Sequence, residues 1–313
     1  MNYKTTLLIG VITLFYGCHA QKSNTTTEQN ETKISNNYFG NYTINNSTYG
    51  TKTTMAIDGD YRVMTTNALP NHATGEYPRK GNPNTISAQK KSYKIPLKPT
   101  FTGVAKWVRE PGVALNGVKF EPETAEMVIC DSGENFRVEA VQDLINLGLD
   151  FNNAHVQPTG EYHYHGISEA LVEAFDSGED LVHLGFAKDG FPIYYSKSGA
   201  FKSSFQIIDG IYSATDCTYS NPKTSMDVEL ENDEFDGTFV SDWEYVKGLG
   251  DLDECNGVYV NGAYAYMVTD SYPFVGRCLM GEFEEERHPA GPPPGQGGRG
   301  QRPPRRQGQN QRP

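Results

Sequence analysis

The residues best suited to chemistry form a short block rich in tyrosine and histidine at 160–166 (GEYHYHG). Successive side chains of an extended strand point to opposite faces, so His163 and His165 are predicted on one face, with Tyr162 and Tyr164 on the other. Residues two apart in a strand lie ~6.6 Å from each other. Two imidazoles can lean together over that distance and bind one ion at ~2.0–2.1 Å. The block therefore predicts two ligands of a metal site.

A third ligand has to come from elsewhere in the chain, and two histidines are candidates. His155 precedes the turn-forming residues 157–160 (QPTG), which predict an antiparallel return that brings it near the pair. His183 lies in the next apolar run. Four of the seven histidines thus fall between residues 155 and 183. Neutral imidazoles suit zinc or copper, and also iron or nickel. The alternative is that these histidines are hydrogen-bonded core residues without an ion.

Other residues of the block are predicted to support the histidines. Glu161, Tyr162 and Tyr164 are the expected hydrogen-bonding neighbours of the metal ligands. Glu161 also fits a general base, although a solvated strand face explains it equally well. Calcium is not expected at residues 251–254 (DLDE), because the spacing of an EF-hand loop is missing. No serine-hydrolase elbow or phosphate-binding loop occurs in the sequence.

A second segment repeats the skeleton of the histidine block. Residues 262–267 (GAYAYM) carry glycine and both tyrosines at the positions of 160–165, with Ala265 and Met267 in place of the two histidines. Residues 190–193 (GFPI) similarly resemble 271–274 (SYPF). If the segments are structurally equivalent, the tyrosines belong to the scaffold and the histidines are additional. The alternative is chance similarity.

The elements that must position these residues are predicted to be mainly β-strands. The chain contains 19 Tyr, 15 Phe and 32 Gly, and short β-prone runs recur between glycine, asparagine and aspartate clusters. We expect one large, sandwich-like β domain over residues 38–286, with a few short helices. One helix is predicted at 136–147, where the apolar residues share a face, and a second is expected after a cap at Ser168.

The two ends of the chain predict an exported protein. Residues 1–18 resemble a signal peptide, since about ten apolar residues are too few to span a bilayer. Cys18 fits the lipid-anchored residue of a lipoprotein, followed by a flexible tether over 19–37. The alternative is cleavage after Ala20, which gives a periplasmic or secreted protein. Residues 287–313 are predicted to be a disordered tail rich in Pro, Gly, Arg and Gln.

Cysteine usage agrees with export. Four cysteines remain after the signal segment, and an even number in an oxidising compartment favours two disulfides. Three pairings are possible. The one favoured here joins Cys255 to Cys278, the closer pair, and therefore Cys130 to Cys217.

Net charge argues against nucleic acid as a partner. The chain carries −12 overall, and because the six arginines of residues 287–313 contribute +6, the preceding residues sum to −18. A body this acidic repels the phosphate backbone. The expected partner is instead the membrane, through the lipid on Cys18.

Several segments together resemble the YHYH protein family, in order and with plausible spacing. The resemblance extends from about Pro111 to Gly281 and is carried by 112–118 (GVALNGV), 153–166 (NAHVQPTGEYHYHG), 189–194 (DGFPIY), 252–257 (LDECNG), 264–266 (YAY) and 277–278 (RC). The family is characterised by the motif itself, so the resemblance implies a domain and not a reaction.

Three functions are compatible with these observations. The first is an exported protein with a histidine-lined site for a divalent metal. The second is a non-catalytic module that binds carbohydrate or peptide through its many aromatic residues. The third is a metal-dependent hydrolase or oxidase, which needs an open coordination position and a placed acid or base.

Overall fold

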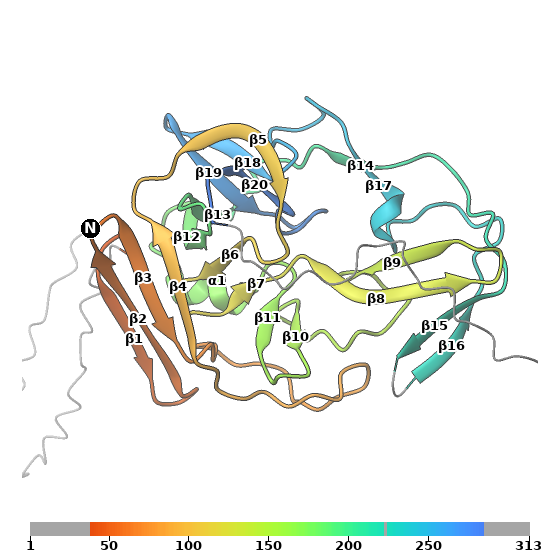
Figure 1. The fold of residues 1–313 in the computed structure, drawn as a ribbon, viewed down its shortest axis with the longest axis horizontal. Coiled ribbons are helices and arrows are strands. Elements are labelled where there is room, and N and C mark those ends of the chain that lie inside the picture. Colours follow the sequence, from red (N-terminus) through yellow and green to blue (C-terminus); the bar gives the residue numbers. More distant parts are fainter. Residues whose placement is uncertain (1–37, 222–223, 285–313) are drawn as a thin grey trace, which may run out of the picture. The chain divides into compact units, whose positions relative to one another are not determined.

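A computed structural model describes residues 38–221 and 224–284, which are predominantly β-strand (Figure 1). The expectation of a mainly β fold is confirmed. The signal segment, Cys18, the tether and the tail lie outside the described residues. Two of the sheets have four strands each: β1 (Tyr42–Asn46), β2 (Thr51–Asp58), β3 (Tyr61–Thr66) and β4 (Lys91–Pro96) in one, and β16 (Thr224–Val228), β15 (Cys217–Asn221), β8 (Glu123–Cys130) and β9 (Asn135–Glu139) in the other.

The largest sheet has eight strands and positions the histidine block. Its spatial order is β10 (Ala154–Val156), β11 (Tyr162–Tyr164), β7 (Lys119–Phe120), β6 (Gly112–Ala114), β12 (Leu181–Ala187), β13 (Pro192–Ser196), β19 (Ala263–Val268) and β18 (Gly257–Val260). Two-stranded ladders join β14 (Phe205–Ile207) to β17 (Trp243–Tyr245) and β20 (Cys278–Gly281) to β5 (Phe101–Trp107).

The eight-stranded sheet consists of two halves with the same connectivity. In the first half, the antiparallel hairpins β6–β7 and β10–β11 meet through a parallel pairing of β7 with β11. In the second half, the hairpins β12–β13 and β18–β19 meet through a parallel pairing of β13 with β19. The halves join where β6 pairs with β12, so β10 and β18 lie at opposite edges of the sheet.

Two apolar cores support these sheets. The first lies on the eight-stranded sheet and the β1–β4 sheet, and its fully buried members include Met64, Leu115, Phe120, Tyr162, Tyr164 and Leu184. The second belongs to the β8–β9–β15–β16 sheet and the loops around it, with Val128, Val138, Ile145 and Phe239 fully buried. The strands β6 and β11 are buried along their whole length, whereas β2 alternates between buried and exposed positions.

Both predicted disulfides are present. Cys130 and Cys217 are directly opposite each other on β8 and β15, in the second core. Cys255 is bonded to Cys278 and so connects the turn before β18 to β20. A disulfide removes conformational freedom from the unfolded chain, so each bond stabilises the sheet that it joins.

One of the two predicted helices is present. The helix α1 (Glu169–Phe175) begins after Ser168, whose hydroxyl accepts a hydrogen bond from the Leu171 amide at 3.1 Å. The helix predicted at 136–147 is wrong, because this segment begins as strand β9 in a hairpin with β8 and then turns. Leu144, on its supposed apolar face, is 42% exposed. A short 3-10 helix, η1 (Val240–Asp242), is the other helical element in the described ranges.

None of the helices between residues 38 and 284 is long and apolar enough to cross a bilayer.

Candidate metal centre

The hairpin β10–β11 brings three of the four predicted ligands together. His155 lies directly opposite His163 in the antiparallel ladder, across the turn expected at 157–160. His163 and His165 share a face of the strand, as alternation requires. The three ring centroids form a triangle with sides of 4.7 Å. One nitrogen of each ring lies within 4.8 Å of the other two, so the cluster could hold a metal ion.

A hydrogen bond on the outer nitrogen of His155 directs its Nε2 atom toward that of His165. His155 Nδ1 donates to the Leu147 carbonyl at 2.9 Å, which leaves a lone pair on Nε2 of the neutral ring. His165 Nε2 lies 3.1 Å from that atom. Two nitrogens bound to one tetrahedral zinc ion are ~3.4 Å apart, so the observed separation suits a shared ion.

The second ring nitrogen of His165, Nδ1, is also consistent with this arrangement. Its Nδ1 is buried and accepts or donates no hydrogen bond of normal geometry within the described chain. The Pro122 carbonyl lies close enough to favour the protonated ring. A proton on Nδ1, directed at that carbonyl, is the tautomer that frees Nε2 for a metal.

Burial keeps all three rings neutral. The pKa of His155 is lowered by desolvation. Desolvation and the neighbouring imidazoles lower the pKa values of His163 and His165 well below the ordinary value. His163 and His165 are each only 2% exposed, whereas His155 is partly exposed. A neutral imidazole offers a lone pair, so the ligands are ready for a cation at neutral pH.

A buried charge cluster lies beside the triad. Lys119 is adjacent to His163 in the parallel ladder and is 2% exposed. Its ammonium is 2.7 Å from carboxylate oxygens of both Glu110 and Glu121, and 3.8 Å from Glu161. The carboxylates of Glu121 and Glu110 keep the pKa of Lys119 raised despite its burial. The positive charge in turn contributes to the lowered pKa of His163.

The residues predicted to support the ligands have other partners. The Glu161 carboxylate pairs with Lys91 at 2.9 Å, and only its backbone carbonyl approaches a ring, at 3.3 Å from His163 Nδ1. Tyr162 donates to Asp150 Oδ2 at 2.8 Å. The Tyr164 hydroxyl bonds His72 Nε2 at 2.6 Å. Both tyrosines therefore anchor the face of the hairpin opposite the triad. They position the three histidines only through the backbone, without touching the rings by hydrogen bonds.

His183 is not brought to the other three histidines. Its ring stacks on Phe39 with centroids 4.4 Å apart and packs against Phe186 and Tyr194. Its Nε2 bonds the Gly185 carbonyl at 2.9 Å. Burial lowers the pKa of His183 to about 3, so it is a neutral core residue.

Sequence reasoning missed the side chains that hold β10 in place. Tyr77 donates to the Ala154 carbonyl at 2.8 Å, on one side of His155. Asn82 and Asn84 donate to the Val156 carbonyl on the other side, at 2.9 and 2.7 Å. These donors come from the loop between β3 and β4, far away in the sequence. No local pattern indicates such long-range contacts.

The second half of the sheet reproduces the scaffold of this site. Tyr264 donates to Asp253 Oδ2 at 2.6 Å, as Tyr162 does to Asp150. The amide of Met267 donates to the Asn256 carbonyl at 2.8 Å, and the amide of His165 donates to the Asn153 carbonyl at the same distance. Both asparagines have positive φ, of 49° and 60°.

The register of the two hairpins shows what replaces the triad. His155 and His163 are opposite each other in the first, and Val258 and Ala265 are opposite each other in the second. Met267 occupies the place of His165. The similarity predicted between 160–165 and 262–267 is therefore structural. The similarity of 190–193 to 271–274 is not structural. Gly190 lies in the β12–β13 turn and matches Gly117 in the β6–β7 turn, with φ angles of 96° and 90°.

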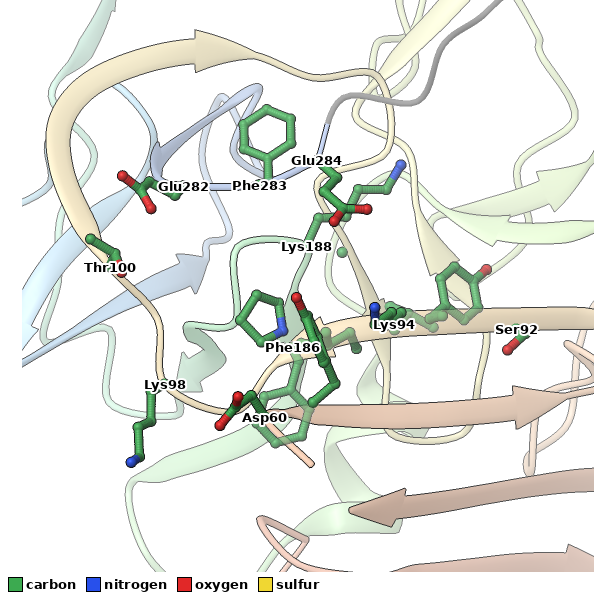
Figure 2. A pocket seen from close by; sticks show the side chains of 16 residues that line it. Asp60, Ser92, Lys94, Lys98, Thr100, Phe186, Lys188, Glu282, Phe283 and Glu284 are labelled. Atoms are coloured by element: carbon green, nitrogen blue, oxygen red, sulfur yellow. The ribbon is translucent and has the colours of Figure 1, made fainter. Parts of the chain in front are cut away.

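Two of the cavities between described residues lie away from the triad. One, of about 740 Å³, lies between β3, β4, β6 and the residues after β20 (Figure 2). The other, of about 340 Å³, lies between β13, β19 and residues 199–205. Neither of these two cavities is lined by a histidine of the triad. A substrate held in either one would not touch the ligands.

The chain belongs to the YHYH protein family. A comparison with protein families matches residues 92–281 to the family described as "YHYH protein", which is more than half of the chain. The matched region contains the whole eight-stranded sheet, the triad and all four cysteines of the disulfides. Comparisons with curated proteins and with solved structures found no match.

Proposed function

We propose that this domain is a metal-binding module in which His155, His163 and His165 hold one zinc or copper ion. The observation that carries the proposal is the triangle of neutral, buried imidazoles on one half of the sheet, set against Val258, Ala265 and Met267 on the other. A scaffold that folds with apolar residues at these positions has no need of three histidines. Metal binding gives them a role.

The burial of two of the three ligands favours binding over catalysis. A catalytic zinc needs a coordination position that substrate can reach. His163 and His165 are buried, and the two cavities described above are lined by other residues. These observations favour a structural or carrier metal site over the active site of a hydrolase or oxidase.

An exported location is part of the proposal. Two disulfides in one domain are typical of proteins that fold in an oxidising compartment. The apolar segment at 7–16 and Cys18 fit a lipid-anchored protein of the cell envelope, with a periplasmic or secreted form as the alternative.

Metal titration tests the site. The purified protein is titrated with Zn²⁺ and, separately, with Cu²⁺, and bound metal is measured by mass spectrometry after gel filtration. We expect one ion per chain, and more than ~100-fold weaker binding in the double variant His163→Ala/His165→Ala, since loss of an outer-sphere partner alone costs ~10–100-fold. His183→Ala is the matched control and keeps the wild-type stoichiometry. Stoichiometric binding that survives the double substitution would defeat the proposal.

A further inference from the structure

The larger cavity runs along the free edge of a sheet. Five consecutive residues of β4, from Ser92 to Pro96, line it. Within the described residues β4 pairs with β3 on one side and is the last strand of its sheet. Figure 2 shows this strand on one side of the cavity and Glu282, Phe283 and Glu284 on the other. Its volume of about 740 Å³ is within the range of ligand sites.

The register of β4 shows which backbone groups face the cavity. The Leu97 amide donates to the Asp60 carbonyl, directly across the ladder from β3. Antiparallel pairs alternate between bonded and non-bonded positions, so Ile95 and Tyr93 also bond β3. The amides and carbonyls of Ser92 and Lys94 therefore point away from β3. These four groups form the edge of an incomplete ladder.

Two of the aromatic rings around this edge do not offer a platform for sugar. The ring of Tyr61 is covered by the Lys94 ammonium, 3.8 Å from its centroid, and the ring of Phe186 is covered by Arg62 at 4.5 Å. Cations already occupy these aromatic faces, so they are not free to stack on a pyranose.

The charges around the cavity are balanced. Three lysines and three carboxylates line it: Lys94, Lys98, Lys188, Asp60, Glu282 and Glu284. A polyanion or a polycation would meet as much repulsion as attraction there. An extended peptide fits better, because its backbone is neutral and its side chains can carry either sign.

We propose that the β4 edge binds an extended segment of another protein as an added strand. The main chain of that segment pairs with the amides and carbonyls of Ser92 and Lys94, which supplies affinity. Its side chains alternate between solvent and the partly exposed apolar surface of Pro96 and Phe283 in the cavity. A carboxylate of the segment lies opposite Lys94. The site is separate from the metal centre and does not depend on it.

A peptide array identifies a probe for this site. The full-length protein is applied to synthetic nine-residue peptides with alternating apolar and polar residues, each containing one glutamate, and the tightest binder is labelled for fluorescence anisotropy. Backbone N-methylation of that peptide at alternate residues removes its donors. We expect affinity to fall by about tenfold or more, since at least two hydrogen bonds are lost.

A substitution on the protein tests the same contact. Ser92→Pro removes the outward amide and leaves the β3 ladder intact, as proline is tolerated where the amide of an edge strand faces solvent. It should weaken peptide binding by a similar factor, and an unchanged circular dichroism spectrum shows that the variant folds. Lys94→Gln should weaken binding in a salt-dependent way.

Three outcomes would overturn the proposal. One is that no peptide of the array binds. The second is that N-methylation and Ser92→Pro both leave the affinity unchanged. The third is that an array of neutral oligosaccharides binds instead and competes with the peptide. The N-methylated peptide keeps the test decisive even if the proline variant fails to fold.

Discussion

The two halves of the eight-stranded sheet share a scaffold and differ most at the three positions of the triad. Each half has a tight turn that contains a glycine, Gly117 or Gly190. In each half a tyrosine of the outer hairpin also donates a hydrogen bond to an aspartate that precedes this hairpin in the sequence. The inner tyrosines also match, since Tyr164 bonds Asn116 at 3.0 Å and Tyr266 donates to Asp189 at 2.6 Å. The largest difference lies in the outer hairpin, where one half has the triad and the other has apolar side chains.

This comparison separates what the fold requires from what the site adds. The tyrosine–aspartate pairs occur in both halves, so they belong to the fold. Burying three polar imidazoles without a cation yields no more stabilisation than burying valine, alanine and methionine. The triad is therefore an addition to a working scaffold. That is the pattern expected of a functional site.

The largest effect is expected when the first half is given the residues of the second. The variant His155→Val/His163→Ala/His165→Met should lose metal binding by more than ~100-fold while keeping its fold, because the other half folds with these residues. Calorimetric titration measures the binding and circular dichroism the fold. Replacing Val258, Ala265 and Met267 with histidines is the converse, and should raise the capacity to two ions. An unfolded first variant would show that the halves are not equivalent.

The triad should also make the metal-free protein sensitive to acid. The pKa values of His163 and His165 are lowered in the folded state and return to ~6.5 on unfolding. Below pH ~6.5 the unfolded chain therefore binds more protons, and the free energy of unfolding falls by up to ~1.4 kcal/mol per pH unit for each ring. Urea denaturation of the metal-free protein between pH 5 and 8 measures this.

The apolar triple variant is the control for that pH series. It lacks the three rings, so its stability should fall less between pH 7 and 5 than that of the wild type. Parallel curves for the two proteins would contradict the low pKa values and, with them, the readiness of the rings for a cation.

Local pattern predicted the centre of the site because its geometry is local. Strand alternation places His163 and His165 on one face, and a four-residue turn returns His155 opposite them. The same reasoning reached the skeleton shared with 262–267, because both segments are the inner strands of equivalent hairpins. The pairing of cysteines followed from their separation in the sequence.

Contacts between segments that are distant in the sequence could not be predicted from local patterns. His183 was grouped with the triad because it is near in sequence, but β12 pairs with β6 and β13 in the middle of the sheet. Lys119 reaches His163 through a parallel pairing, whose partners no local signal identifies. The apolar positions of 136–147 are compatible with either a strand or a helix. Pairing with strand β8 makes the beginning of this segment a strand. The recurring Asp-x-x-Asn at 150–153 and 253–256 could have revealed the scaffold.

A smaller effect is expected where the halves differ in charge. Asp189 occupies the place of Asn116, and burial raises its pKa to about 6. A raised carboxyl pKa contributes stability that is present below its unfolded value of ~3.9 and is lost as the pH rises through 6. Asp189→Asn should therefore destabilise the protein most near pH 4, with a penalty that shrinks on the order of 3 kcal/mol by pH 7.

Denaturation of Asp189→Asn and the wild type across this range measures the difference. Effects of the histidines cancel, because both proteins contain them. A penalty that stays constant from pH 4 to 7 would show that Asp189 is ionised throughout. The amide should still cost stability at neutral pH, since its nitrogen would face the Gly281 amide that now donates to Asp189 Oδ2 at 3.0 Å.

The smallest effect distinguishes the two tyrosine–aspartate pairs. Tyr162→Phe removes the donor to the buried Asp150, and Tyr264→Phe removes the donor to the partly exposed Asp253, each at a cost of about 1–3 kcal/mol. The Tyr162 hydroxyl also accepts from Asn152 at 3.1 Å, and Cys255 occupies that place in the second half. Tyr162→Phe should therefore cost about 1 kcal/mol more. Urea denaturation measures both, and metal stoichiometry should be unchanged in both, because the hydroxyls support the hairpins from the face opposite the ligands.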